Sequence, residues 1–220
     1  MCAAPFGGIG GPLMRAIGKK PAEVNPNMCG TCLNFVSTHH GGAEIGLSLL
    51  FADIRGSTSL AETIPASEFR VLIERFYNAA ANAVFEHDGF LDKFVGDEVV
   101  ASFAPLLAGE QHAARAVEAA QALMKATGNG EGDTPWAPLG AGVHTGIAWM
   151  GAVGDGPAAS ITTLGDAVNV AARLAALAAA GEILVTTDAA MAAGIDPTLP
   201  RRMLDLRGKL QKTEVISLRV

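Results

Sequence analysis

The feature that most constrains this chain is a pair of short apolar runs joined by a tight acidic turn. Residues 90–94 and 99–103 have the composition of β-strands, and Gly96 and Asp97 lie between them. Glycine and aspartate are common turn residues, and a carboxylate at such a turn points out of a rigid sheet. The pattern predicts a β-hairpin whose turn places the Asp97 carboxylate where it could hold a cation over a phosphate.

The remaining segments predict an α+β fold. Residues 47–54 form a nearly continuous apolar run, typical of a strand covered on both faces, and residues 67–84 and 110–125 show helical spacing of apolar side chains. Two strands are expected within residues 139–153, with a long helix from Asp166. A further strand, a short helix and a closing hairpin complete the chain. Helices against a mostly antiparallel central sheet indicate a ferredoxin-like core with additions.

Length, charge and hydropathy exclude several classes of protein. A chain of 220 residues is long enough for one main domain, and its net charge of -6 disfavours a nucleic-acid partner. No run of about 18 apolar residues predicts a membrane span, and glycine and proline interrupt the start where a signal peptide needs an apolar core. Three cysteines do not make a disulfide framework. These features predict a cytoplasmic protein without a membrane span.

The first 46 residues are expected to be a flexible N-terminal arm that contains a Cys-x-x-Cys segment. Cys29 and Cys32 precede His39 and His40, which gives half of the pattern of a zinc knuckle. The two histidines are adjacent and lack the spacing of a second pair of zinc ligands. The alternative is a small loop packed on the domain, with both thiols reduced.

A second acidic residue ends the strand at residues 47–54. Asp53 is followed by Arg55 and then by a Gly-Ser-Thr helix start, where free backbone N–H groups bind phosphates. The backbone candidates for phosphate binding are Ile54, Gly56, Ser57 and Thr58. The alternative for Asp53 is a helix N-cap, and Arg55 is either a phosphate ligand or a solvated side chain.

A pair of polar side chains shares one face of the helix that begins at Asp166. Asn169 and Arg173 are four residues apart, so they are neighbours on the helix surface. An amide beside an arginine fork suits a ribose oxygen next to a transferring phosphate. The alternative is an ordinary exposed face of a helix.

Four of these segments together resemble a known family. They are residues 51–58 (FADIRGST), 93–98 (KFVGDE), 142–146 (GVHTG) and 165–174 (GDAVNVAARL). In this order and at these spacings they resemble the catalytic domain of class III nucleotidyl cyclases, the adenylate and guanylate cyclase family. The resemblance covers about residues 47–220, which are expected to form the catalytic domain.

The resemblance implies a catalytic role for four of the residues singled out above. Asp53 and Asp97 match the metal-binding pair, which holds two divalent cations, Mg²⁺ or Mn²⁺. Arg173 matches the arginine that stabilises charge on the α-phosphate, and Asn169 the residue that orients the ribose. The family builds each site between two domains in head-to-tail arrangement, so the resemblance implies a homodimer with two shared sites.

The resemblance also implies how the purine is selected. Lys93 and Thr162 match the two purine-selecting positions. An ammonium donates to adenine N1, and a hydroxyl accepts from the 6-amino group, so the pair favours ATP. The commonest family pattern has aspartate at the position of Thr162, so this chain resembles the subclass with threonine there. A hydroxyl can also donate a hydrogen bond, so it could meet the guanine oxygen. The selection of ATP over GTP is therefore expected to be less strict with threonine than with aspartate at this position.

The expected activity is therefore adenylate cyclase, converting ATP to 3′,5′-cyclic AMP and pyrophosphate. A guanylate or mixed-specificity cyclase is the first alternative. Diguanylate cyclases and polymerase palms share the two-metal hairpin, but they lack the helix with Asn169 and Arg173. Diguanylate cyclases also need a second glycine at the position of Val95. A nucleotide-binding dimerisation module without turnover is the remaining alternative.

Overall fold

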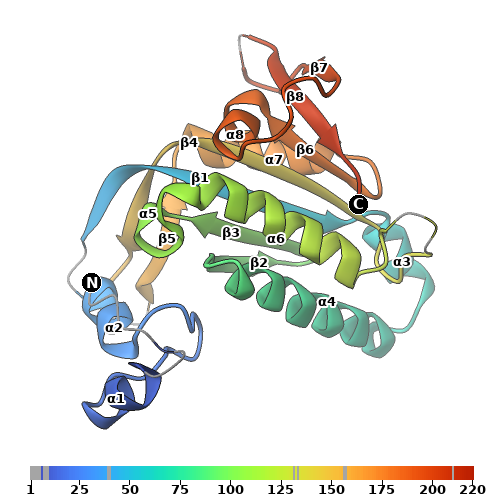
Figure 1. Ribbon diagram of the computed structural model, residues 1–220. Helices are drawn as coiled ribbons and strands as arrows, with labels where there is room; N and C mark the ends of the chain where they lie inside the picture. Colours follow the sequence, from blue (N-terminus) through green and yellow to red (C-terminus); the bar gives the residue numbers. More distant parts are fainter. Residues whose placement is uncertain are drawn as a thin grey trace.

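The computed structural model describes residues 6, 10–38, 41–130, 132, 134–155, 158–209 and 211–220. Within them one mixed sheet runs in the order β2-β3-β1-β4-β6-β8-β7, and β5 pairs with the far end of β4 (Figure 1). All neighbours are antiparallel except β4 and β6, which are parallel. The strands are β1 (Gly42–Ile54), β2 (Phe90–Val95), β3 (Glu98–Phe103), β4 (Leu139–Val153), β5 (Ser160–Leu164), β6 (Glu182–Thr186), β7 (Arg201–Leu204) and β8 (Thr213–Leu218). The fold is α+β, as the sequence predicted.

Helices cover the two faces of this sheet unequally. The described helices are α1 (Gly10–Ala16), α2 (Gly30–Thr38), α3 (Ser57–Thr63), α4 (Ala66–Glu86), α5 (Pro105–Ala108), the 3₁₀ turn η1 (Gly109–Gln111), α6 (His112–Ala126), α7 (Asp166–Leu177) and α8 (Thr187–Ala192). Helices α4 and α6 lie side by side on one face (Figure 1). Helix α7 packs on the opposite face against β1 and β4.

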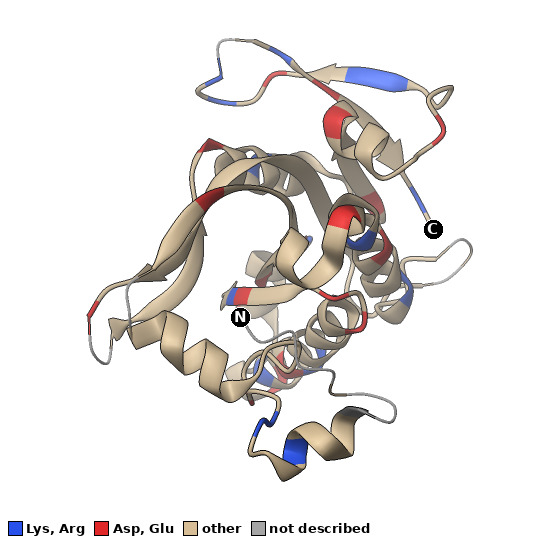
Figure 2. Ribbon diagram, turned by 60° about the vertical axis from the view of Figure 1, so that its left-hand side comes forward, with Lys and Arg blue, Asp and Glu red and all other residues tan. Residues whose placement is uncertain are grey.

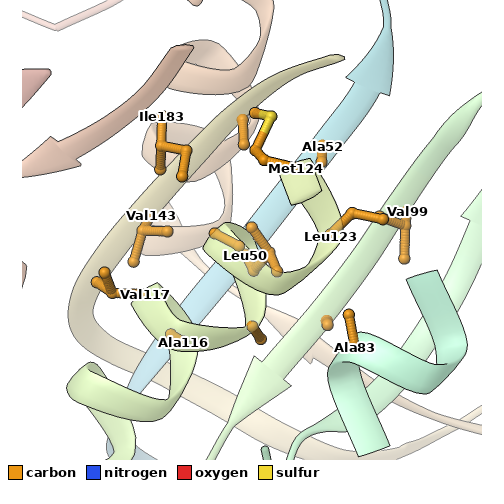
Figure 3. Close-up of a cluster of buried hydrophobic side chains, with 14 of the residues drawn as sticks. Leu50, Ala52, Ala83, Val99, Ala116, Val117, Leu123, Met124, Val143 and Ile183 are labelled. Carbon is orange, nitrogen blue, oxygen red and sulfur yellow. The ribbon is translucent and has the colours of Figure 1, made fainter. Parts of the chain in front are cut away.

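The larger core lies between α4, α6 and the sheet. Figure 3 shows Leu123 and Met124 of α6 directed at the sheet, where Leu50 of β1 and Val143 of β4 are buried. Because side chains alternate along a strand, Leu50, Ala52 and Ile54 of β1 enter this core. The alternate residues Leu47, Leu49 and Phe51 face α7 instead. This alternation decides on which face each site residue lies.

The structure differs from the sequence prediction in the segment 139–153. Two strands around His144 were expected, but β4 is one strand of 15 residues. It pairs without interruption with β1, from Gly42 opposite Gly151 to Ile54 opposite Leu139. The glycines within β4 mark close packing rather than a turn, because a Cβ at Gly142 would lie 2.5 Å from the backbone of α7. The strand that pairs with the end of β4, from Trp149 to Val153, is β5.

The N-terminal segment also differs from the flexible arm that the sequence suggested. It contains α1 and α2, and β1 begins at Gly42 rather than at residue 47. The buried Asn25 side chain forms two hydrogen bonds with Leu91 of β2, from Nδ2 to the carbonyl at 3.1 Å and from the Leu91 N–H to Oδ1 at 2.8 Å. Asn27 donates to the carbonyls of Phe85 and Gly89. These side chains fix the segment to the edge of the sheet.

The Cys-x-x-Cys segment lies at the start of α2. The Cys32 N–H donates to Cys29 Sγ at 3.2 Å. Among the described residues no cluster of three or more His, Cys, Asp and Glu side chains could hold a metal ion. His39 and His40 lie outside the described residues, so a metal site that includes them stays a prediction.

No helix in the described part of the chain has the length and hydropathy needed to cross a membrane.

A buried carboxylate joins β6, β7 and β8 and predicts a pH effect on stability. Glu182 accepts hydrogen bonds from the Ala179 N–H and from Ser217 Oγ and pairs with Arg202 Nη2 at 3.0 Å. Burial raises its pKa, but these hydrogen bonds and the charge of Arg202 outweigh burial and lower the pKa from its ordinary value of 4.5. A lowered folded-state pKa contributes stability above pH 4.5 that is lost as the pH falls through the folded-state value.

We therefore expect Glu182→Gln to lower the free energy of unfolding at pH 7 by about 1.5–3 kcal/mol, the contribution of hydrogen bonds to a charged group. The deficit shrinks as the pH falls below 4.5, because Glu182 is protonated first in the unfolded chain and then, at its lowered pKa, in the folded one. Denaturant unfolding at pH 7 and at lower pH measures both effects. Glu214→Gln is the control, because its ion pair with Arg201 on the same strands is exposed. A deficit that does not change with pH would contradict this role of Glu182.

Candidate active site

The end of β1 presents an acidic pair on the face that carries α7. Leu50, Ala52 and Ile54 enter the core under α4 and α6, so Asp53 points to the opposite face. Its partner in the β1–β3 register is Glu98, which lies on the same face. Two carboxylates are thus adjacent at this edge of the sheet.

Asp97 joins this pair from the turn between β2 and β3. Gly96 has φ 61°, a backbone conformation that favours glycine, and its carbonyl accepts a hydrogen bond from Tyr77 Oη at 2.7 Å. The Ile54 N–H donates to the Asp97 carbonyl at 3.3 Å, which ties the turn to the end of β1. The structure therefore brings together Asp53 and Asp97, which are far apart in the sequence.

Arg55 is fixed beside these carboxylates. Its guanidinium pairs with Asp53 and donates from Nη1 to the Ala176 carbonyl of α7 at 3.1 Å. Gly140 of β4 leaves room for it, because a Cβ there would lie 2.8 Å from Arg55 Nε. Burial lowers the pKa of Arg55, while the charges of Asp97 and Glu98 oppose that shift. Arg55 is thus a half-buried counter-charge to Asp53 and not a solvated side chain.

The donor set at this edge fits a hard divalent cation. Burial raises the pKa of Glu98, and the negative charge of Asp97 raises it further, whereas Arg55 lowers it. Carboxylates crowded in this way gain from a nearby cation, and oxygen donors are the ligands that Mg²⁺ and Mn²⁺ prefer. Asp53 and Asp97 are the residues that would hold such an ion.

An irregularity in β2 determines the direction of Lys93. The register between β2 and β3 shifts between Leu91, opposite Ala101, and Lys93, opposite Val100, so Asp92 is the extra residue of a bulge. Val100 faces α7, as Asp53 does. In a regular strand Lys93, two positions after Leu91, would share the core-facing side of Leu91. The bulge places the Lys93 side chain on the face of the acidic pair.

Lys93 and Thr162 meet although 69 residues separate them. Lys93 Nζ donates to Thr162 Oγ1 at 3.0 Å, and Thr162 Oγ1 lies 2.9 Å from both carboxylate oxygens of Asp92. The Asp92 side chain is 2% exposed and also accepts from the Thr163 N–H at 2.9 Å. The sequence motifs predicted Lys93 and Thr162 as site residues but not Asp92. The only signal for Asp92 was an acidic residue next to Lys93 in a strand that is otherwise apolar at its start.

Helix α7 carries the other two candidate residues. Ala167, Val170, Ala171, Leu174 and Ala175 are buried at helical spacing, which leaves Asn169 exposed and Arg173 half-buried on the other side. No hydrogen bond or ion pair between described residues connects these two side chains with Asp53, Asp97, Lys93 or Thr162. Within a single chain the six candidate side chains therefore form three separate pairs: Asp53 with Asp97, Lys93 with Thr162, and Asn169 with Arg173.

The loop between β7 and β8 passes along α7 near Arg173. A Cβ at Gly208 would lie 3.4 Å from Arg173 Nη2, and Lys209 pairs with Asp166 at the start of α7. Figure 2 shows Lys and Arg on β7 and on this loop, at the top of the view. The part of this loop at Gly208 and Lys209 thus lies beside α7, a neighbour that the sequence pattern did not predict because the loop is distant in sequence.

The backbone candidates for phosphate binding have different surroundings. The Ile54 N–H is engaged by the Asp97 carbonyl, so this candidate is not available in the structure. Gly56 is the N-cap of α3 with φ 75°, and Ser57 and Thr58 open this seven-residue helix. Their role in phosphate binding stays a prediction.

Comparison with known proteins agrees with this arrangement. Residues 44–214 match the family described as "Adenylate and Guanylate cyclase catalytic domain". An adenylate cyclase of Anabaena cylindrica is 31% identical over 182 residues, which cover 78% of this chain and 36% of that protein. Adenylate cyclase 1 of Rhizobium meliloti is 30% identical over 151 residues and 22% of its length. The chain thus spans about a third or less of the length of these curated relatives.

Solved structures share the fold. The adenylyl cyclase CyaB from P. aeruginosa has a TM-score of 0.71 and 26% identity, covering 80% of this chain and 95% of that one. The guanylyl cyclase Cya2 has a TM-score of 0.73 at 23% identity, covering 80% and 93%. Both nucleotide classes therefore occur among proteins of this fold. Because residues 44–214, about four-fifths of its length, match that family, the chain belongs to the adenylate and guanylate cyclase catalytic domain family.

Proposed function

We propose that the protein is an adenylate cyclase that converts ATP to 3′,5′-cyclic AMP and pyrophosphate at sites shared between two copies of the chain. The observation that carries the choice of ATP is the contact between Lys93 Nζ and Thr162 Oγ1 at 3.0 Å. It places a donor, Lys93 Nζ, beside an acceptor, Thr162 Oγ1. Adenine offers the matching groups, an acceptor at N1 next to a donor at the 6-amino group. Two adenylate cyclases among the relatives support the same choice.

Lys93 and Thr162 act as the purine filter. The ammonium group has three donors, of which one goes to Thr162 and one faces Asp92 Oδ1 at 3.3 Å, so the third is available for adenine N1. The Thr162 oxygen accepts from the 6-amino group. Guanine carries a hydrogen on N1 and an oxygen at C6, which reverses both requirements, so a donor at Lys93 opposes GTP.

The acidic edge and α7 carry out the cyclisation. Asp53 and Asp97 would hold two divalent cations, and such ions would lower the pKa of the ribose 3′-OH and neutralise the triphosphate. Asn169 orients the ribose so that its 3′ oxygen faces the α-phosphate. Arg173 stabilises the negative charge that develops on the α-phosphate, a role typically worth several kcal/mol.

Two copies in head-to-tail arrangement bring these groups onto one substrate. Asp53 and Asp97 come from one subunit, while Lys93, Thr162, Asn169 and Arg173 come from the other. The separation of the groups within one chain supports this division. Val95 shares the face of Lys93 and is 55% exposed, and Leu164 shares that of Thr162 and is 48% exposed. Apolar side chains beside the purine filter suit an interface with a second copy.

The purine filter is tested by Lys93→Glu. We expect cyclic AMP formation to fall by roughly 10²-fold and the ratio of ATP to GTP turnover to fall with it, because an acceptor then faces adenine N1. Turnover of each nucleotide is measured with Mn²⁺ by quantifying cyclic product. The matched control is Lys125→Glu, an exposed lysine on α6 on the other face of the sheet, which should leave both rates unchanged. A Lys93→Glu protein with the wild-type ratio would contradict the assignment of the filter.

A further inference from the structure

We infer that Asp92 makes the Thr162 hydroxyl an obligatory acceptor and thereby determines that a threonine at this position selects ATP over GTP. This inference rests on the proposed function of the site and adds a residue to its purine filter. A threonine hydroxyl by itself does not discriminate, because it donates one hydrogen bond and accepts two. The surroundings of Thr162 decide which of these capacities remains for the purine.

The hydroxyl proton of Thr162 is committed to Asp92. Thr162 Oγ1 lies 2.9 Å from both Asp92 oxygens, and a carboxylate only accepts hydrogen bonds. The proton therefore points at Asp92 and away from the substrate. A lysine ammonium has no acceptor either, so Lys93 takes one lone pair of Oγ1 at 3.0 Å. One lone pair of Thr162 is left, and it suits the adenine 6-amino group but not the guanine carbonyl.

Asp92 is held firmly in this role. Its side chain is 2% exposed, and the Thr163 N–H donates to Oδ2 at 2.9 Å. Lys93 Nζ lies 3.3 Å from Oδ1, so the carboxylate has a cation and two neutral donors around it. A buried carboxylate with these partners has no freedom to turn away from Thr162. The bulge in β2 is the backbone feature that allows Asp92 and Lys93, adjacent in sequence, to reach the same hydroxyl.

Asp92 is thus a positioning residue, because it acts through Thr162 and does not touch the nucleotide. The first test is Thr162→Val, which keeps the shape of the side chain and removes the hydroxyl. If Thr162 only accepts, this change lowers kcat/KM for ATP by roughly ten-fold and leaves kcat/KM for GTP unchanged. If the hydroxyl serves both purines, kcat/KM falls equally for both and the inference is wrong.

The second test is Asp92→Ala, which releases the hydroxyl proton of Thr162. We expect kcat/KM for GTP to rise and the preference for ATP to fall by roughly ten-fold. General damage to the site would lower both values in parallel, and that outcome contradicts the inference. In the double variant Asp92→Ala/Thr162→Val, the effect of Asp92 on the preference should disappear. The Thr162→Val result decides the matter if Asp92→Ala does not fold.

Failure of this inference and failure of the proposed function give different results. A wild-type protein that forms no cyclic nucleotide from ATP or GTP rejects the proposed function. The same variants are then compared by their dissociation constants for ATP and GTP, where an unchanged ratio in both variants rejects the inference. A wild-type protein that forms cyclic AMP, with variants that keep the wild-type preference, rejects the inference alone.

Discussion

Replacing Asp97 with alanine is expected to lower the rate of cyclic AMP formation by about 10³-fold or more, a loss of at least about 4 kcal/mol of transition-state stabilisation. Asp97 is held beside Asp53 by the hydrogen bond from the Ile54 N–H to its carbonyl. Removing its side chain leaves that backbone bond in place but takes away one of the two proposed ligands of the cations. The effect should therefore fall on turnover and not on folding.

The control for this variant is Asp196→Ala. Asp196 caps a fully exposed turn through hydrogen bonds from Thr198, on the loop between α8 and β7. Both proteins are assayed for cyclic AMP over a range of Mn²⁺ concentrations, and their unfolding midpoints are compared. Wild-type turnover in a folded Asp97→Ala protein would contradict the proposed role of the acidic pair.

Mixing two inactive variants is expected to restore activity. Asp97→Ala and Arg173→Ala should each be inactive alone, because every site in each homodimer lacks one essential side chain. In a mixed dimer, one site carries both substitutions and the other carries neither. If subunits exchange freely, half of the dimers are mixed, so the mixture should recover about a quarter of the wild-type activity.

A second mixture serves as the matched control for this experiment. Asp53 and Asp97 are assigned to the same subunit of each site, so a mixture of Asp53→Ala with Asp97→Ala leaves every site of every dimer defective. This mixture should recover nothing, at the same protein and nucleotide concentrations. Equal recovery in both mixtures, or none in either after subunit exchange has been verified, would contradict the shared site.

The sequence predicted the fold class because its strong local patterns survive in the structure. The apolar stripe of residues 67–84 became α4, and the acidic turn at Gly96 joins β2 to β3. The division of residues 139–153 into two strands was wrong, because glycines that usually mark turns serve here for close packing. Gly142 and Gly140 make room for α7 and for Arg55, neighbours that only the folded chain supplies.

The sequence predicted those site residues whose chemical role can be inferred from a short motif of neighbouring residues. Asp53, Asp97 and Lys93 stand in short motifs; the structure places Asp53 and Lys93 on one face of the sheet and Asp97 in the turn beside the end of β1. The role of Asp92 could not be predicted, because it depends on a one-residue bulge and on Thr162 seventy positions away. The same is true of Arg55, whose partners Asp53 and Ala176 meet only when α7 packs on β1 and β4.

The most direct test of the proposed activity is product formation by the purified chain with ATP and, in parallel, with GTP in the presence of Mn²⁺ or Mg²⁺. We predict cyclic AMP and pyrophosphate in equal amounts from ATP, with less cyclic product from GTP, from a protein that sediments as a dimer. A folded, dimeric protein that forms no cyclic nucleotide from either substrate would contradict the account.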